Sequence, residues 1–230
     1  MKTEWTLKEM SNWTRTDSEV RIPAIQRGLV WKPHQVELLW DSILRQFPIG
    51  AFTLSHLHTE GTDIYNLIDG QQRWNAVGLG YGTLSHEDCI LWFDLKPDDK
   101  VWGNSKTTRK YIIRATTKAH PWGYKANDDC NTLNTAQKRV ALQEFGVNTD
   151  NEYKGTISLT ETYPIESELP IPLCWMIVAG EEHSEDKDGF VKCIMDKIEE
   201  NKTSRKFKLK QVDEINDGLI VKYYEAFKSL

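Results

Sequence analysis

The segment from Ile64 to Arg73 combines a strand-like run with polar groups that could hold an anion. The apolar run Ile64–Ile68 ends in Asp69 and Gly70, and Gln71, Gln72 and Arg73 follow before a helix-compatible segment. A glycine lets the backbone turn tightly and approach a ligand closely. The amides that open a helix have no intrahelical partners, and an arginine fork fits phosphate oxygens. The segment therefore predicts a phosphate or nucleotide cradle.

Two readings of this segment compete. A plain strand–turn–helix with a solvated arginine would have the same residues, because one glycine near one arginine is a weak signal. A Walker loop is excluded, since the Gly-x4-Gly-Lys-Ser/Thr spacing is absent. A second pair, Gln26 and Arg27, precedes another strong helix. Two such pairs predict two helix N-termini that converge on one anion, with Arg27 and Arg73 in the same cleft.

Asp69 is the carboxylate best placed for chemistry. It stands at the expected end of a strand, beside the predicted cradle. There it could hold Mg²⁺ through water or orient a hydrolytic water. The alternative is a structural role as an Asx turn or helix N-cap.

A third polar cluster surrounds the sequence His120-Pro121-Trp122-Gly123. Arg114 and Thr117 precede it at the end of an expected strand. Together Arg114, Thr117 and His120 could line a polar pocket. A structural turn with a packed tryptophan is an equal alternative, because histidines in loops are often simply exposed.

These residues belong to a longer pattern that resembles a known family, the Asp-Gly-Gln-Gln-Arg domain of GmrSD-type modification-dependent restriction enzymes. The resemblance is specific over about residues 20 to 80 and weaker out to about 125. That domain is similar in fold to the ParB and sulfiredoxin superfamily, and residues 70–76 look like the ParB box that contacts nucleotide phosphate. The matching positions are Ile22-Pro23, Gln26-Arg27, Trp31, Gln35, Leu39 to Ile43, Phe47 to Gly50 and Ile68 to Arg73.

The resemblance implies an NTP-binding and NTP-hydrolysing domain of a DNA restriction or phage-defence system. NTP with Mg²⁺ would be the cofactor. Gln26, Arg27, Gly70, Gln71, Gln72 and Arg73 would hold the phosphates, and Asp69 would serve the metal or the water. Nucleotide state would gate a separate nuclease domain, usually of the His-Asn-His kind, and DNA would be reached through that domain or a partner. No such nuclease motif is recognised in this chain, so endonuclease activity of the chain alone is not expected.

Two other function classes stay open. One is a DNA-binding or modified-base-sensing module that uses the same cleft without turnover. The other is a regulatory interaction domain with a degenerate nucleotide site. Nucleotide binding without hydrolysis would favour either of them over an enzyme, and a salt-dependent affinity for DNA would indicate the first.

The elements that must position these groups follow from periodicity. We expect a helix at 5–12, a strand at 20–25, a helix from Pro33 to about Phe47, a hairpin at 51–68 and a helix at 74–79. Strands at 89–95 and 111–116 complete an α+β, ParB-like core. Helices at 134–145, 185–200 and 212–230 follow a loop-like stretch, and residues 173–179 are ambiguous between strand and helix. The expected division is 1–125 for the core and 126–230 for a mostly helical extension, whose final apolar pattern favours a longer natural protein.

Composition bounds the class of protein. The 230 residues have a net charge of −5, which argues against a general nucleic-acid coat protein. Residues 1–125 carry 16 basic and 14 acidic side chains, whereas residues 126–230 carry 13 and 20, so the acidity lies in the second half. Four cysteines without a Cys-x-x-Cys pair, and no apolar run near 18 residues, favour a cytoplasmic protein without a membrane span. The oligomeric state stays open, a homo-oligomer included.

Overall fold

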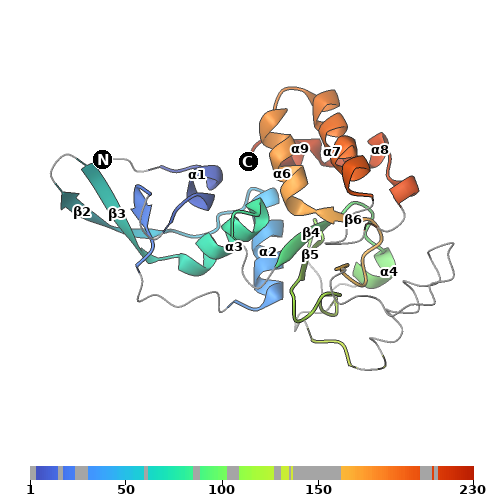
Figure 1. Ribbon diagram of the computed structural model, residues 1–230, viewed down its shortest axis with the longest axis horizontal. Helices are drawn as coiled ribbons and strands as arrows, with labels where there is room; N and C mark the ends of the chain where they lie inside the picture. Colours follow the sequence, from blue (N-terminus) through green and yellow to red (C-terminus); the bar gives the residue numbers. More distant parts are fainter. Residues whose placement is uncertain are drawn as a thin grey trace.

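The computed structural model of the chain describes most of its residues (Figure 1). The described residues are 4–14, 18–23, 31–59, 62–84, 89–102, 109–126, 131–134, 136, 162–202, 209 and 212–230. The predicted helix at 134–145, apart from residues 134 and 136, and most of the predicted loop at 148–170 lie outside them.

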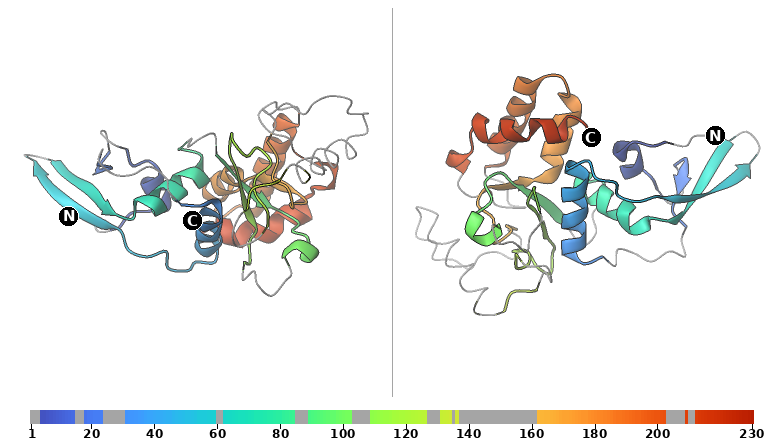
Figure 2. Two further views of the ribbon diagram at one scale, coloured as in Figure 1. Left: turned by 90° about the horizontal axis from the view of Figure 1, so that it is seen from below. Right: turned by 180° about the vertical axis from the view of Figure 1, so that it is seen from behind.

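A small sheet forms one end of the molecule. Strand β2 (Thr53–Thr59) and strand β3 (Thr62–Asp69) make the predicted antiparallel hairpin, and β1 (Val20–Arg21) runs parallel to β3 on its other side. Figures 1 and 2 show this hairpin reaching away from the rest of the chain. Helix α1 (Leu7–Ser11), which a Thr6–Glu9 capping box opens, lies near its base. The side chains buried here are Met10, Trp13, Val20, Ile22, Tyr65, Leu67 and Trp74.

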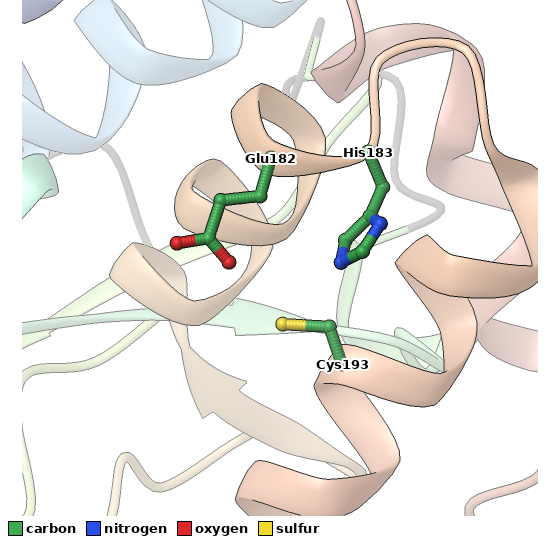
Figure 3. A group of neighbouring side chains, drawn as sticks. All are labelled: Glu182, His183 and Cys193. Carbon is green, nitrogen blue, oxygen red and sulfur yellow. The ribbon is translucent and has the colours of Figure 1, made fainter.

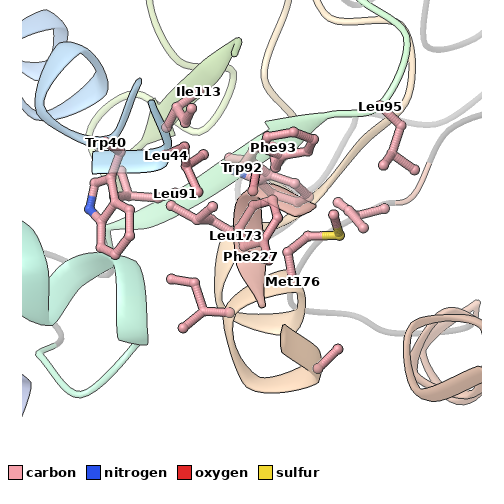
Figure 4. Close-up of a cluster of buried hydrophobic side chains, with 14 of the residues drawn as sticks. Trp40, Leu44, Leu91, Trp92, Phe93, Leu95, Ile113, Leu173, Met176 and Phe227 are labelled. Carbon is pink, nitrogen blue, oxygen red and sulfur yellow. The ribbon is translucent and has the colours of Figure 1, made fainter. Parts of the chain in front are cut away.

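The main core surrounds a second three-stranded sheet. Its order is β5 (Ile113–Thr116), β4 (Ile90–Asp94) and β6 (Pro170–Pro172), with both pairs antiparallel. All four residues of β5 are buried. Figure 4 shows how side chains from distant parts of the chain meet on it, among them Trp40, Trp92, Phe93, Leu173 and Phe227.

Two helices lie between the two sheets. Helix α2 (Pro33–Leu44) starts at a proline, whose missing N–H costs nothing in the first turn, and helix α3 (Gln71–Tyr81) ends at Gly82 in the left-handed conformation. The Trp40 indole donates to the Ala76 carbonyl at 2.8 Å and fixes the two helices against each other. Trp40, Trp74 and Trp92 are buried, and Trp31 is partly buried.

The second half of the chain is largely helical among its described residues. Helix α6 (Leu173–Glu182) resolves the ambiguous run at 173–179, and α7 (Lys187–Asn201) confirms the helix predicted at 185–200. A short helix that was not predicted, α4 (Asp99–Trp102), follows β4.

The single helix predicted at 212–230 is wrong. This segment consists of η1 (Val212–Glu214), α8 (Asp217–Ile220), η2 (Val221–Tyr223) and α9 (Tyr224–Phe227). The break has a local cause: Asn216 adopts an extended backbone, and its side chain accepts the Leu219 amide at 3.2 Å to start a new helix. An asparagine whose side chain bonds to a nearby backbone amide in this way competes with helix continuation.

The fold is α+β, as predicted. Strand β6 and helices α6 to α9 share one hydrophobic core with β4, β5, α2 and α3, so residues on both sides of position 125 pack together. The likeness to the ParB and sulfiredoxin superfamily stays a prediction. No helix in the described part of the chain is both long and apolar enough to cross a membrane.

Candidate phosphate-binding site

The junction between β3 and α3 has the tight turn that the sequence predicted. Gly70 is the residue before the helix, and its φ of 101° lies in the left-handed region that favours glycine. A Cβ atom at Gly70 would lie 2.5 Å from Cδ1 of Phe52, so a side chain has no room there. The first intrahelical bond is donated by Trp74 to the Gly70 carbonyl at 2.9 Å. The amides of residues 71 to 73 therefore precede the hydrogen-bonded ladder, as in anion-binding helix N-termini.

Arg73 is held in one orientation by three contacts. Its Nη1 donates to the Ile49 carbonyl at 3.1 Å, and its Nη2 donates to Oδ2 of Asp69 at 3.3 Å. The guanidinium carbon lies 5.1 Å from the centre of the Phe52 ring. Among the described residues, the Ile49 carbonyl and Asp69 are the hydrogen-bond partners of Arg73, and they take two of its five guanidinium N–H groups.

Gly50 and Phe52 position this arginine, and the sequence did not identify their role. Gly50 has a φ of 89°, and a Cβ atom there would lie only 2.1 Å from Nη1 of Arg73. Phe52 packs against both Gly70 and the guanidinium. In the sequence, Gly50 was the one hint of this role, because a glycine allows another group to approach the backbone closely.

Gln71 and Gln72 open helix α3 and are both partly buried. The side-chain oxygen of Gln72 accepts the backbone N–H of Trp31 at 3.2 Å. This contact joins the first turn of α3 to the segment that leads into α2, across 41 positions of sequence.

Asp69 is the most exposed member of the group. Its side chain is 75% exposed, whereas that of Arg73 is 19% exposed. Helix α3 has Gly70 as its N-cap and no side-chain cap bond, so Asp69 does not cap it. Among the described residues, Arg73 binds Oδ2 of Asp69, and the high exposure of this carboxylate lets water reach it.

Gln26 and Arg27 lie outside the described residues, and the expectation that Arg27 shares a cleft with Arg73 stays a prediction. The described residues on both sides of this segment are placed, however. Arg21 pairs with Asn66 on β3, and Trp31 contacts Gln72 on α3. The residues before the segment therefore lie against β3, and those after it lie against the first turn of α3.

The second predicted pocket, of Arg114, Thr117 and His120, lies around a tight turn and not at the start of a helix. Thr117 and His120 close a tight turn, because each donates its amide to the other's carbonyl, at 3.1 and 3.0 Å. Arg114 is fully buried, and its Nη2 donates to the Tyr124 carbonyl. The His120 ring lies 4.9 Å from the Tyr124 ring, so Tyr124 is the residue that links the arginine to the turn. Ligand binding by these three residues stays a prediction.

Arg114 also belongs to a buried ion cluster that sequence reasoning missed. Glu37 of α2 is 1% exposed; it accepts Arg109 Nη1 at 2.8 Å and the Ala115 amide at 3.0 Å, and lies 4.0 Å from Arg114. Trp102 stacks against both guanidinium groups, at 5.0 Å from Arg114 and 5.5 Å from Arg109. This cluster ties α2 to β5. The sequence did not reveal the role of Glu37, because its partners lie more than 70 positions away along the chain.

Comparison with known proteins identifies the family. A family model described as the N-terminal domain of the GmrSD restriction endonuclease matches residues 8–229. No curated protein and no solved structure matches the chain.

Proposed function

The chain belongs to the family of GmrSD restriction endonuclease N-terminal domains, and from this premise we propose that it binds and hydrolyses a nucleoside triphosphate at the β3–α3 junction. Family membership supports a role in phage defence. Nucleotide binding, hydrolysis and control of a nuclease are the proposal.

The observation that carries this proposal is the guanidinium of Arg73, which its contacts with Ile49 and Phe52 hold in place at the start of α3. In the structure, one side of the Arg73 fork is filled by a carboxylate oxygen of Asp69 at 3.3 Å. A phosphate oxygen has the same charge and acceptor character as that carboxylate oxygen. The amides of the first turn and the positive end of the helix dipole add favourable interactions with an anion at this place.

Asp69 would then change partners. The carboxylate is exposed, so it can leave Arg73 at little cost when phosphate takes its place. Freed from Arg73, it would bind Mg²⁺ through water or orient the attacking water, as phosphoryl transfer requires. Arg73 would stay anchored meanwhile, because its contacts with Ile49 and Phe52 do not involve Asp69.

Gln72 offers a route by which nucleotide could gate a nuclease domain. Its contact with the Trp31 amide couples the first turn of α3 to the segment before α2. A phosphate at the first turn would shift this contact and, through α2, the buried ion cluster around Glu37. In this proposal DNA is contacted by the nuclease domain or a partner, in keeping with the net charge of −5.

A panel of ATP, GTP, CTP and UTP, titrated with and without Mg²⁺ and followed by phosphate release, tests the proposal. We expect at least one triphosphate to bind with a stoichiometry of one per chain and to be hydrolysed only with Mg²⁺. Binding without release would refute the hydrolysis and favour a sensing module. The absence of binding by all four would refute the nucleotide site itself.

A further inference from the structure

The hairpin of helices α6 and α7 brings together three side chains of the types that bind transition metals. One ligand atom each from Glu182, His183 and Cys193 lie within 4.8 Å of one another. Figure 3 shows the carboxylate and the imidazole coming from the end of α6 and the thiol from α7, turned toward one another. None of the three has a part in the phosphate site.

The local structure explains how these groups meet. Helix α6 ends at Glu182, and His183 closes it by donating its amide to the Ala179 carbonyl at 3.0 Å. The Asp186 amide donates to the His183 carbonyl at 3.1 Å, so the chain turns back within three residues. Cys193 follows two helical turns into α7, on the side that faces the end of α6.

A carboxylate lies beside the imidazole, as is usual for metal-binding histidines. Nδ1 of His183 lies 3.7 Å from Oδ2 of Asp186, while Oδ1 of Asp186 accepts the Gly189 amide at 2.9 Å. A carboxylate that accepts a hydrogen bond from one ring nitrogen would orient the ring and leave the other nitrogen for a metal. Gly189 makes room for this arrangement, because a Cβ there would lie 2.5 Å from Nδ1 of His183.

The charged groups around these three side chains favour the binding of a cation. His183 and Cys193 line a hollow of about 370 Å³, together with Gly189, Lys192, Asp196, Lys197 and Glu200. With Glu182 and Asp186, which lie next to the hollow, the region has four carboxylates and two lysines. A bound divalent cation would offset this excess of negative charge.

We propose that Glu182, His183 and Cys193 form a binding site for Zn²⁺, with water in the fourth position. Thiolate, imidazole and carboxylate together suit Zn²⁺, whereas Mg²⁺ prefers oxygen ligands alone. Binding converts the Cys193 thiol to a thiolate and releases one proton to solvent, so no oxidant or reductant is needed. The metal would hold the end of α6 to α7, two helices that pack on the main core through Ile177, Phe190 and Ile194.

Cobalt serves as the probe, because a thiolate bound to Co²⁺ gives a charge-transfer band in the near ultraviolet. The full chain, without a polyhistidine tag and stripped with chelator, is titrated with Co²⁺, and Zn²⁺ is then added in competition. We expect the band to saturate at one Co²⁺ per chain and to disappear with one Zn²⁺. Cys193→Ser should abolish it, and Asp186→Asn should weaken metal binding by roughly 10- to 100-fold.

Cys174→Ser is the matched control, since Cys174 is also half-buried and on α6 but lies outside the group. It should leave the band unchanged. Gly189→Ala removes no ligand but displaces the imidazole, so it should weaken Co²⁺ binding while circular dichroism stays helical. A parent protein without the band, or a band that persists in Cys193→Ser, overturns the proposal.

Discussion

Replacement of Arg73 by alanine separates the two roles that this side chain has in the structure. The variant loses a hydrogen bond to the Ile49 carbonyl, worth about 1 kcal/mol, and a contact with the Phe52 ring, worth about 0.5–1 kcal/mol. The pair with Asp69 adds at most about 0.5 kcal/mol, because that carboxylate is 75% exposed. We expect the free energy of unfolding to fall by about 2 kcal/mol, with a native circular dichroism spectrum.

The loss of nucleotide affinity should be distinct from this loss of stability. A hydrogen bond to a charged group is worth about 1.5–3 kcal/mol, so Kd for the preferred triphosphate should rise roughly 12- to 140-fold. Calorimetric titration of the parent and the variant, at a temperature where both are folded, measures it.

Arg45→Ala is the matched control. Arg45 pairs with Asp41 at 3.2 Å and stacks on Phe47 at 4.2 Å, so it makes the same kinds of contact as Arg73. Arg45 lies directly after the C-terminal end of α2, where the side chain of Gln46 donates to the Ser229 hydroxyl. The control should lose comparable stability and keep its affinity. Equal affinity of Arg73→Ala and the parent would show that Arg73 is structural only.

Four further predictions concern the same region and the core. Asp69→Asn should largely keep nucleotide affinity and strongly reduce Mg²⁺-dependent phosphate release; unchanged turnover would make Asp69 a turn residue. If Arg27 and Arg73 share one anion, their alanine substitutions should be non-additive in a double-mutant cycle of Kd, and additivity would argue for separate sites. Gly50→Ala should lower both stability and affinity, because the new Cβ would lie 2.1 Å from Nη1 of Arg73 at a φ of 89°; a parent-like Kd would count against that packing. Burial raises the pKa of Tyr223 to about 12, so the stability that its neutral phenol contributes is present below about pH 10 and is lost as pH rises toward 12; in alkaline unfolding curves Tyr223→Phe should lose less stability over that range, and parallel curves would refute this.

Local patterns explain what the sequence could predict. The hairpin, the tight turn at Gly70 and the start of α3 follow from alternation, turn chemistry and helix periodicity within about twenty residues. The contacts that orient Arg73 come from Ile49 and Phe52, more than twenty positions earlier, and no local signal identifies them. Arg114 shows the same limit, since its type suggested a pocket and only the fold reveals Glu37 beside it.

The prediction of one helix at 212–230 was wrong for another reason. The apolar positions after Val212 fit helical spacing, so periodicity alone predicted one helix. The side-chain cap of Asn216 divides the segment, and the short helices then pack Ile220, Tyr224 and Phe227 into the main core. Here a capping bond and tertiary packing outweighed the periodic pattern.

A crystal structure of the chain with Mg²⁺ and a non-hydrolysable form of its preferred triphosphate tests the nucleotide site most directly. We predict phosphate oxygens within hydrogen-bond distance of the amides of residues 71–73 and of the Arg73 guanidinium, with Asp69 released from Arg73 and turned toward the metal. A nucleotide bound elsewhere, with Arg73 still paired to Asp69 at the start of α3, would contradict it.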